Sequence, residues 1–372
     1  MSDTEFIEWD GGRIRLRPGD CRDLIASLPD ASVDAVVTDP PYEIGFMGRA
    51  FDSTGIAFDR ALWADVLRVL KPGGHLLAFG ATRTYHRLAC AVEDAGFEIR
   101  GQIDWIYAEA MPHGSDAGLL VDRALGAVRP RGSERVPATP QGAEWAGWFT
   151  QLKPAHEPVC LARRPLEGTL AANLMKWGTG ALHIDACRVP SPGGHPLSAT
   201  RRDNNIYGRM NRSLPWEPGD RFAPDILLDP AAAAALDAQS GYSVSRRGRP
   251  RASAAPGAGW GMTRTGAEYD DEGGASRYYP VFRYEPKAPA RERPRADGIL
   301  HPTVKPLGLM RWLVRLATPA DGLVLEPFAG SGATLQACRV EGMRCVAAEM
   351  DDGYVRLVER RMERPVTEAM DV

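Results

Sequence analysis

The chain has 372 residues, a formal net charge of −3, 44% hydrophobic residues and 25% charged residues. These values are typical of a globular protein and argue against a chain that binds polyanions over its whole surface. No apolar run approaches the roughly 20 residues that a membrane-spanning helix requires. The start, Met1 to Glu5, lacks the basic and then apolar order of a signal peptide, so we expect a cytoplasmic protein.

Two regions alternate strands with helices, and they lie at opposite ends of the chain. In the first, we expect strands at residues 33–38, 75–79 and 97–107 and helices at 60–70 and 85–95. The sequence Lys71-Pro72-Gly73-Gly74 is a stop signal for the first of these helices. In the second, we expect helices at 307–317, 332–340 and 352–362 and strands at 322–326 and 344–348.

This alternation predicts an α/β fold with a doubly wound, mostly parallel sheet. Neither region has enough strands alone, so we expect residues 1–110 and 301–372 to form two halves of one core. Residues 111–300 have a different sequence pattern, because hydrophobic periodicity is poor there apart from an Ala-rich helix at 230–238. Within this insert we expect residues 150–185 to return to the core, with a strand at 159–162, and residues 240–275 to be flexible.

A basic tract lies in the insert, because no acidic residue occurs between Ala238 and Ala267. Two interpretations stay open, a solvated loop and an arm that contacts DNA phosphates. The arginines concerned are Arg246, Arg247, Arg249, Arg251 and Arg264.

The most informative short segment is Asp39-Pro40-Pro41-Tyr42, which follows the first strand. Ligands bind at the carboxyl ends of strands in open α/β sheets, and two prolines make the turn rigid. The turn offers the Asp39 carboxylate and the Pro40 carbonyl as acceptors beside the flat ring of Tyr42. These groups suit a planar aromatic amine, such as a base that has left its duplex.

A second motif, residues 325–334, connects a strand to a helix, and Gly330 and Gly332 permit close approach of a ligand to the backbone. The motif is neither a Walker loop nor a dinucleotide-binding Gly-x-Gly-x-x-Gly sequence. Glu349 ends the next strand about 20 residues later, the spacing at which an acidic residue binds ribose hydroxyls in nucleoside-binding βαβ units.

Other residues that often bind ligands lack a supporting pattern. The six cysteines stand singly and the histidines show no metal-ligand spacing, so we expect no metal site. The side chains of Trp105, Trp145 and Trp148 are suited to stacking on bases, but we expect them to pack in the core.

Taken in order, the motifs resemble those of the beta-class DNA amino-methyltransferases of bacteria and their phages. In that family the catalytic motif precedes the cofactor motif, a circularly permuted order, and the target-recognition region lies between them. The resemblance covers nearly the whole chain and implies a sheet of the seven-stranded methyltransferase type. It also implies S-adenosylmethionine as cofactor, double-stranded DNA as substrate, and a homodimer.

The resemblance gives each region a role. Residues 1–110 would be the catalytic half, 111–300 the target-recognition region and 301–372 the cofactor-binding half. Gly19-Asp20-Cys21 is similar to the family's segment that meets the cofactor's adenine, and His301–Pro306 to the motif that closes over the cofactor. The cofactor-binding residues so implied are Asp20, Cys21, Thr38, Asp39, His301, Thr303, Lys305, Glu326, Pro327, Phe328, Ala329, Gly330, Ser331, Gly332 and Glu349; the catalytic ones are Asp39, Pro40, Pro41 and Tyr42.

Two residues depart from the family pattern, since Glu326 replaces the usual Asp and Ala333 the usual Thr. Neither removes a group that methyl transfer needs. An aspartate at the start of the catalytic motif favours N6 of adenine over N4 of cytosine, which stays the alternative. Methyl transfer to RNA or to a protein glutamine, and a catalytically silent DNA-binding protein, are further alternatives.

Overall fold

The computed structural model describes residues 6–45, 50–108, 114–129, 136–190, 203–204, 208–209, 221–245, 271–282, 293–296 and 298–365. The five arginines of the basic tract lie outside these residues. Within the described ranges, no helix has the length and apolarity to cross a bilayer. The same ranges contain no cluster of three or more His, Cys, Asp or Glu side chains arranged to hold a metal ion.

The described part of the chain forms one nine-stranded sheet with the order β1-β2-β13-β12-β3-β4-β6-β5-β9. Its strands are β1 (Ile7–Trp9), β2 (Ile14–Pro18), β3 (Val33–Thr38), β4 (Leu70–Phe79), β5 (Glu98–Ile106), β6 (His156–Arg163), β9 (Ile226–Leu228), β12 (Leu323–Glu326) and β13 (Arg344–Glu349). The five strands from β2 to β4 in this order, which include β13, β12 and β3, are parallel. Strand β6 is antiparallel to both of its neighbours, β4 and β5. The predicted doubly wound sheet is confirmed, with β1 and β9 added at its edges.

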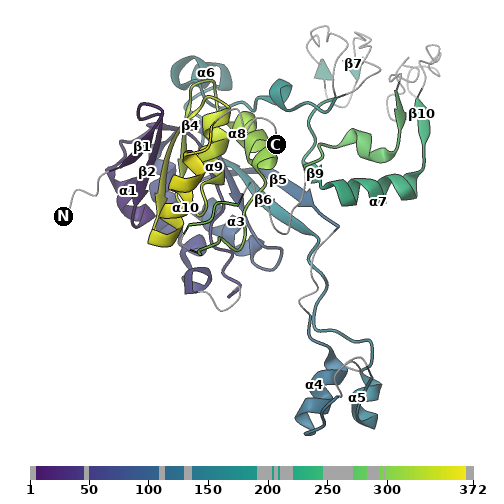
Figure 1. Cartoon of the computed structure of the whole chain (residues 1–372). Helices are drawn as coiled ribbons and strands as arrows, with labels where there is room; N and C mark the ends of the chain where they lie inside the picture. Colours follow the sequence, from purple (N-terminus) through teal and green to yellow (C-terminus); the bar gives the residue numbers. More distant parts are fainter. Residues whose placement is uncertain are drawn as a thin grey trace.

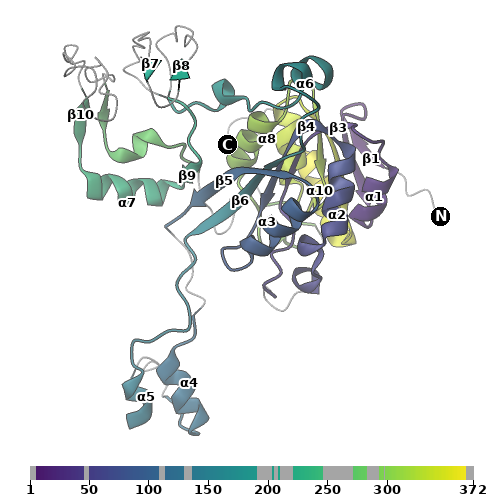
Figure 2. The same ribbon diagram turned by 180° about the vertical axis from the view of Figure 1, so that it is seen from behind.

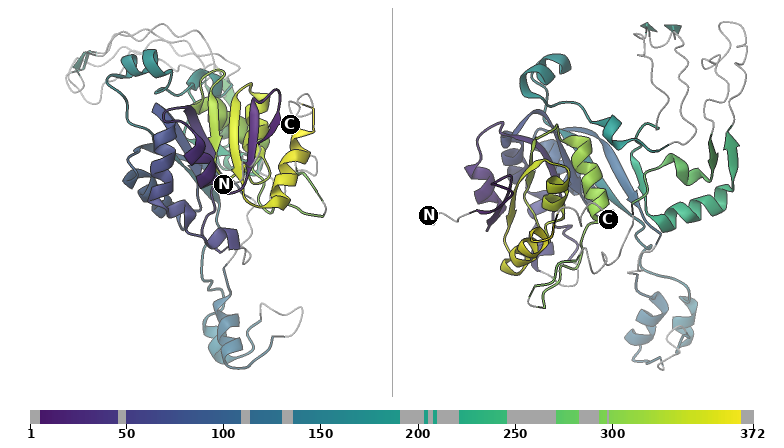
Figure 3. Two further views of the ribbon diagram at one scale, coloured as in Figure 1. Left: turned by 90° about the vertical axis from the view of Figure 1, so that its left-hand side faces the viewer. Right: turned by 45° about the horizontal axis from the view of Figure 1, so that its top comes forward.

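Helices cover both faces of the sheet (Figures 1 and 2). On one face lie α1 (Cys21–Ser27), α2 (Arg60–Val69) and α3 (Tyr85–Asp94), and on the other α8 (Leu307–Ala317), α9 (Ala333–Val340) and α10 (Asp352–Met362). Successive side chains of β3 point to opposite faces of the sheet. Val36 packs on the face covered by α1 to α3, and Val37 on the face covered by α8 to α10. Figure 3 shows the sheet between these layers.

The start of β4 differs from the prediction. The stop signal at residues 71–74 does end a helix, but the strand already begins at Leu70. The pairing register of β4 with β3 shifts between Val33 and Ala35, and this irregularity accommodates the additional residues of β4. Gly74 is required there, because a Cβ would lie 2.7 Å from the Leu70 side chain and 2.9 Å from the Asp34 carbonyl oxygen.

A helical unit formed by α4 (Ala117–Ala124) and α5 (Pro140–Glu144) stands away from the sheet (Figure 1). Asp122 holds it together, since its carboxylate accepts hydrogen bonds from Arg129 Nε and from two backbone N–H groups. The prediction for Trp145 and Trp148 is wrong, because these side chains are 46% and 62% exposed. Trp105, by contrast, is buried in the core as expected.

The remaining elements lie around the sheet and in a second projecting unit. Strand β6 is the predicted return of the insert to the core. The second unit contains α7 (Pro230–Ser240), β10 (Ser243–Ser245), β11 (Asp271–Gly273) and η5 (Ala275–Tyr278). The others are α6 (Leu170–Trp177), η2 (Ala50–Ser53), η3 (Ile56–Phe58), η4 (Ile184–Cys187), β7 (Asp203–Asn204) and β8 (Gly208–Arg209).

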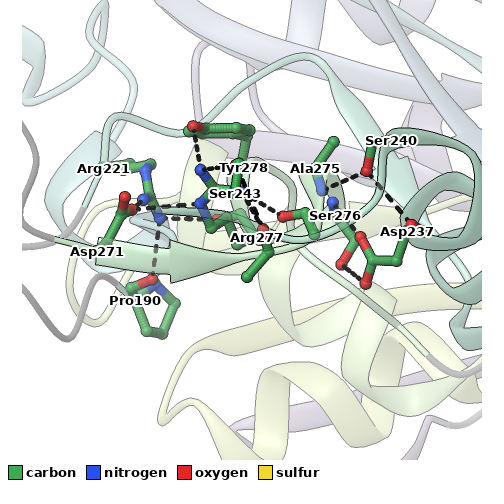
Figure 4. A network of polar contacts seen from close by, with 12 residues as sticks. Pro190, Arg221, Asp237, Ser240, Ser243, Asp271, Ala275, Ser276, Arg277 and Tyr278 are labelled. Carbon is green, nitrogen blue, oxygen red and sulfur yellow. Dashed lines mark hydrogen bonds and ion pairs between the residues drawn. The ribbon is translucent and has the colours of Figure 1, made fainter. Parts of the chain in front are cut away.

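A buried ion-pair network fixes this second unit (Figure 4). The Asp271 carboxylate pairs with the guanidinium groups of Arg221 and Arg277, and the side chains of Asp271 and Arg221 are 2% and 6% exposed. Arg221 also donates to the Arg277 carbonyl oxygen at 2.8 Å. One carboxylate therefore pairs with two guanidinium groups.

The variant Asp271→Asn should destabilise the second projecting unit by about 3–5 kcal/mol, because it leaves two guanidinium groups without their counter-charge. Hydrogen exchange of residues 221–245 and 271–282 measures this local stability. The control Asp185→Asn removes the charge of a carboxylate that is 78% exposed and pairs with Arg188, and it should change little. Unchanged exchange in Asp271→Asn would contradict the assignment.

Candidate active site

The turn that begins at Asp39 leaves the carboxyl end of β3, where all six strand residues are buried. Pro40 is also buried, and Thr84 Oγ1 donates to the Tyr42 carbonyl oxygen at 2.7 Å. The backbone N–H of Glu43 donates to Asp52 Oδ1 at 2.9 Å. Two prolines and these bonds at its far end hold the turn in one conformation.

Lys305 meets this turn although it is 266 residues away in sequence. Its Nζ lies 2.6 Å from Asp39 Oδ2, 3.0 Å from the Tyr42 hydroxyl and 3.2 Å from Glu157 Oε2. The whole residue is 6% exposed. The sequence predicts that Lys305 binds the cofactor, whereas the structure places its ammonium group against the Asp39 carboxylate.

Glu157 completes the cluster and is absent from the residues that the sequence predicts. It lies at the amino end of β6, which is antiparallel to β4, and therefore reaches the same edge of the sheet as the carboxyl end of β3. The Tyr42 hydroxyl donates to Glu157 Oε2 at 2.8 Å. The sequence indicates a strand here but gives no signal for its direction, on which the position of Glu157 depends.

The charges in the cluster determine its protonation. Burial raises the pKa of Tyr42 well above its usual value, and the negative charges of Asp39 and Glu157 raise it further. Burial alone would lower the pKa of Lys305, but the same two carboxylates outweigh this effect and raise it. Tyr42 therefore stays a neutral donor and Lys305 a cation.

The second oxygen of the Asp39 carboxylate, Oδ1, is buried and has no hydrogen-bond partner among the described residues. An unsatisfied buried acceptor costs free energy, on the order of 1–3 kcal/mol. Oδ2 is bound to Lys305, so Oδ1 is the oxygen that can accept a proton donor from a ligand entering the site.

The predicted glycine loop lies beside this turn, because β12 pairs directly with β3. The loop leaves β12 at Pro327 and enters α9 after Gly332, with positive φ angles of 53° at Gly330 and 80° at Gly332. The Gly330 N–H donates to Glu349 Oε2 at 2.7 Å. Burial raises the pKa of Glu349 to about 7.

Asp20 follows β2 and precedes α1. β2 pairs with β13, the Gly19 N–H donates to the Glu349 carbonyl oxygen at 2.7 Å, and Asp20 caps α1 by accepting from the Arg22 N–H at 2.8 Å. The carboxyl ends of β2, β13, β12 and β3 are thus consecutive along one edge of the sheet. The structure brings together Asp20, Glu349, Gly330 and Asp39 there.

His301 covers the glycine loop, since a Cβ at Gly330 would lie 3.1 Å from His301 Nε2. The His301 ring centroid is 4.5 Å from that of Tyr354. Burial lowers the pKa of His301 to about 4, so the ring is neutral near pH 7. Thr303 has an exposed side chain and contributes its carbonyl oxygen, 2.9 Å from His301 Nδ1.

Glu326 is 1% exposed and lies beneath the loop. Its carboxylate accepts hydrogen bonds from Thr38 Oγ1 at 2.5 Å, from the Phe328 N–H at 3.0 Å and from the Thr334 hydroxyl. It therefore joins β3, the loop and α9. Other residues predicted to bind the cofactor also have buried side chains, namely Cys21, Thr38, Ala329 and Ser331.

Comparison with known proteins identifies a family for most of the chain. Residues 33–360 match the family model described as DNA methylase. The chain is 22% identical over 298 residues to the type II methyltransferase M.HindIII of Haemophilus influenzae. That alignment covers 79% of this chain and 65% of the relative, slightly less than two thirds of its length.

Solved structures resemble the chain at low identity. The M1.HpyAVI–SAM complex has a TM-score of 0.41 and 15% identity, with 94% of this chain and 100% of that one covered. The cytosine-N4-specific PvuII DNA methyltransferase has a TM-score of 0.46 and 14% identity, with 96% and 90% covered. Likenesses at this level do not bear on function.

The burial of Glu326 should make stability depend on pH. Burial raises its pKa from 4.5 to about 8, so the folded protein holds this proton more tightly than the unfolded chain. The resulting stabilisation is fully present below pH 4.5 and is lost as the pH rises towards 8. Glu326→Gln cannot ionise, so its melting temperature should fall less over this range; parallel curves for the two proteins would contradict the assignment.

Proposed function

The chain belongs to the DNA methylase family, and from that premise we propose that it methylates an exocyclic amino group of a DNA base, N6 of adenine, with S-adenosylmethionine as donor. The observation that carries this proposal is the free acceptor at Asp39 Oδ1, beside the ring of Tyr42. An amino group has two N–H donors, and the Asp39 carboxylate and the Pro40 carbonyl offer two acceptors.

The target base must leave its duplex to reach this site, because its amino group is otherwise paired. Tyr42 is suited to stack on the extruded base, since its hydroxyl is held by Glu157 and Lys305 and its ring is thereby fixed. Asp39 and the Pro40 carbonyl accept hydrogen bonds from the two amino N–H groups. These bonds draw electron density toward the amino nitrogen as its lone pair leaves conjugation with the ring. The amine becomes a better nucleophile.

The residues around the glycine loop fit the proposed donor. A Cβ at Gly330 would lie only 3.1 Å from His301 Nε2, and the carboxylates of Glu349, at the end of β13, and Asp20, just after β2, lie on neighbouring strand ends beside the loop. We assign these carboxylates to the adenosine part, with Glu349 on the ribose hydroxyls. When bound, S-adenosylmethionine supplies a methyl group on a positively charged sulfur.

The protein's main contribution is then alignment of the amine, which can supply about 7–11 kcal/mol. No covalent bond to the protein is needed. The choice of adenine rests on the aspartate that begins the motif, and nucleoside analysis of methylated DNA tests it. N6-methyladenine supports the proposal, whereas N4-methylcytosine would favour the alternative base.

Asp39→Ala should lose about 2–4 kcal/mol of transition-state stabilisation, roughly 30-fold to 900-fold in kcat, because the amine loses its charged acceptor. Transfer of a radiolabelled methyl group to DNA measures kcat, and calorimetry should show unchanged binding of S-adenosylmethionine. Asp30→Ala, an exposed residue outside the site, is the control. A fully active Asp39→Ala would end the assignment.

Asp20→Ala and Glu349→Ala should instead weaken the affinity for S-adenosylmethionine, by roughly tenfold each if each carboxylate loses about 1.4 kcal/mol of hydrogen bonding. Isothermal calorimetry measures both Kd values. Asp10→Ala, in the turn between β1 and β2 at the opposite end of β2 from Asp20, should bind as the wild type does. Wild-type affinity in both site variants would mean that the donor binds elsewhere.

A further inference from the structure

We propose that Glu157 is a positioning residue for methyl transfer: it holds Lys305 and Tyr42 together and keeps the Asp39 site anionic. This proposal rests on the proposed function. Glu157 touches neither the base nor the donor; it acts through the two side chains that contact Asp39 and the base.

A single oxygen of Glu157 contacts both Tyr42 and Lys305. Glu157 Oε2 accepts from the Tyr42 hydroxyl at 2.8 Å and lies 3.2 Å from Lys305 Nζ. The Tyr42 hydroxyl is also 3.0 Å from Lys305 Nζ, so the three groups form a closed triangle. The side chains of Glu157 and Lys305 are 19% and 7% exposed, so solvent screens this triangle weakly.

The Lys305 ammonium is confined from its other side as well. It lies 4.7 Å from the ring centroid of Phe79 and 5.1 Å from that of Tyr42. These aromatic faces favour a cation. With Glu157 behind it, the ammonium group stays on Asp39 Oδ2 and leaves Oδ1 for the amino group.

The charge balance is the second part of the argument. Asp39 and Glu157 face a single ammonium group, so the cluster carries a net charge of −1. Without Glu157, Asp39 and Lys305 would form a neutral, closed ion pair. A carboxylate neutralised in this way is a weaker acceptor for hydrogen bonds and for protons.

A proton acceptor is needed because methyl transfer leaves a surplus proton. The nitrogen lone pair forms the new N–C bond while the C–S bond breaks and its electron pair stays on sulfur. The nitrogen then carries a positive charge and one proton too many. We assign this proton to Asp39 Oδ1, which becomes a neutral carboxylic acid until solvent removes the proton.

The charged and titratable groups that face Asp39 come from three elements. They are Lys305 before α8, Glu157 on β6 and Glu326 on β12, with Tyr42 in the same turn. Glu326 is buried beneath the loop and unchanged in the test below. Removing the Glu157 charge therefore changes one negative neighbour of Asp39 and leaves Lys305, Tyr42 and Glu326 in place.

The test is Glu157→Gln, which removes the charge and keeps the shape. We expect kcat for DNA methylation to fall at least tenfold with little change in KM for S-adenosylmethionine. Glu157→Asp keeps the charge and should retain more activity.

The control is Glu98→Gln, which breaks an ion pair with Arg163 at 2.6 Å at the other end of β5 and β6. It should leave both kcat and the KM for S-adenosylmethionine unchanged. Wild-type kcat in Glu157→Gln, a loss that appears in KM and not in kcat, or equal losses in Glu157→Gln and Glu157→Asp would overturn the proposal. Wild-type protein unable to methylate DNA would instead overturn the proposed function, so the two failures are distinct.

Discussion

The parallel pairing of β3 with β12 is the constraint on which the site depends. Leu325 lies opposite Val36, so the catalytic turn and the glycine loop leave the same edge of the sheet side by side. The hydrogen bond from Thr38 to Glu326 ties the two strand ends together. A slip of one residue in this register would turn every side chain of β12 to the opposite face and remove that bond.

Lys305 adds a second tie between distant parts of the chain. A buried ammonium group is costly unless it is paired, and here Asp39 and Glu157 both compensate it. The requirement for pairing makes the geometry specific, because the ammonium group is satisfied only when three segments have docked correctly. Because Lys305 binds Asp39 Oδ2, Asp39 Oδ1 has no donor among the described residues. The contacts that stabilise the buried ammonium group therefore also leave an acceptor for a ligand.

Much of this could be predicted from the sequence. Hydrophobic periodicity located β3 and the helices α8 and α10, and the segments around Asp39 and Gly330 identified the edge of the sheet that carries the site. Glu157 could not be found, because its position depends on the direction of β6, which tertiary packing decides. Trp145 and Trp148 were misassigned because hydrophobicity alone does not distinguish a core from the surface of a projecting unit.

The position of β12 in the sheet also affects how the chain is made. β3 is apolar and buried on both faces, yet its partner lies nearly 300 residues further along, as the hydrogen bond between Thr38 and Glu326 records. During synthesis one edge of β3 therefore has no native partner until the ribosome has translated the long stretch of chain between β3 and β12. A nascent chain of this kind presents an open strand edge for a long time, which favours mispairing with other chains and makes protection by chaperones valuable.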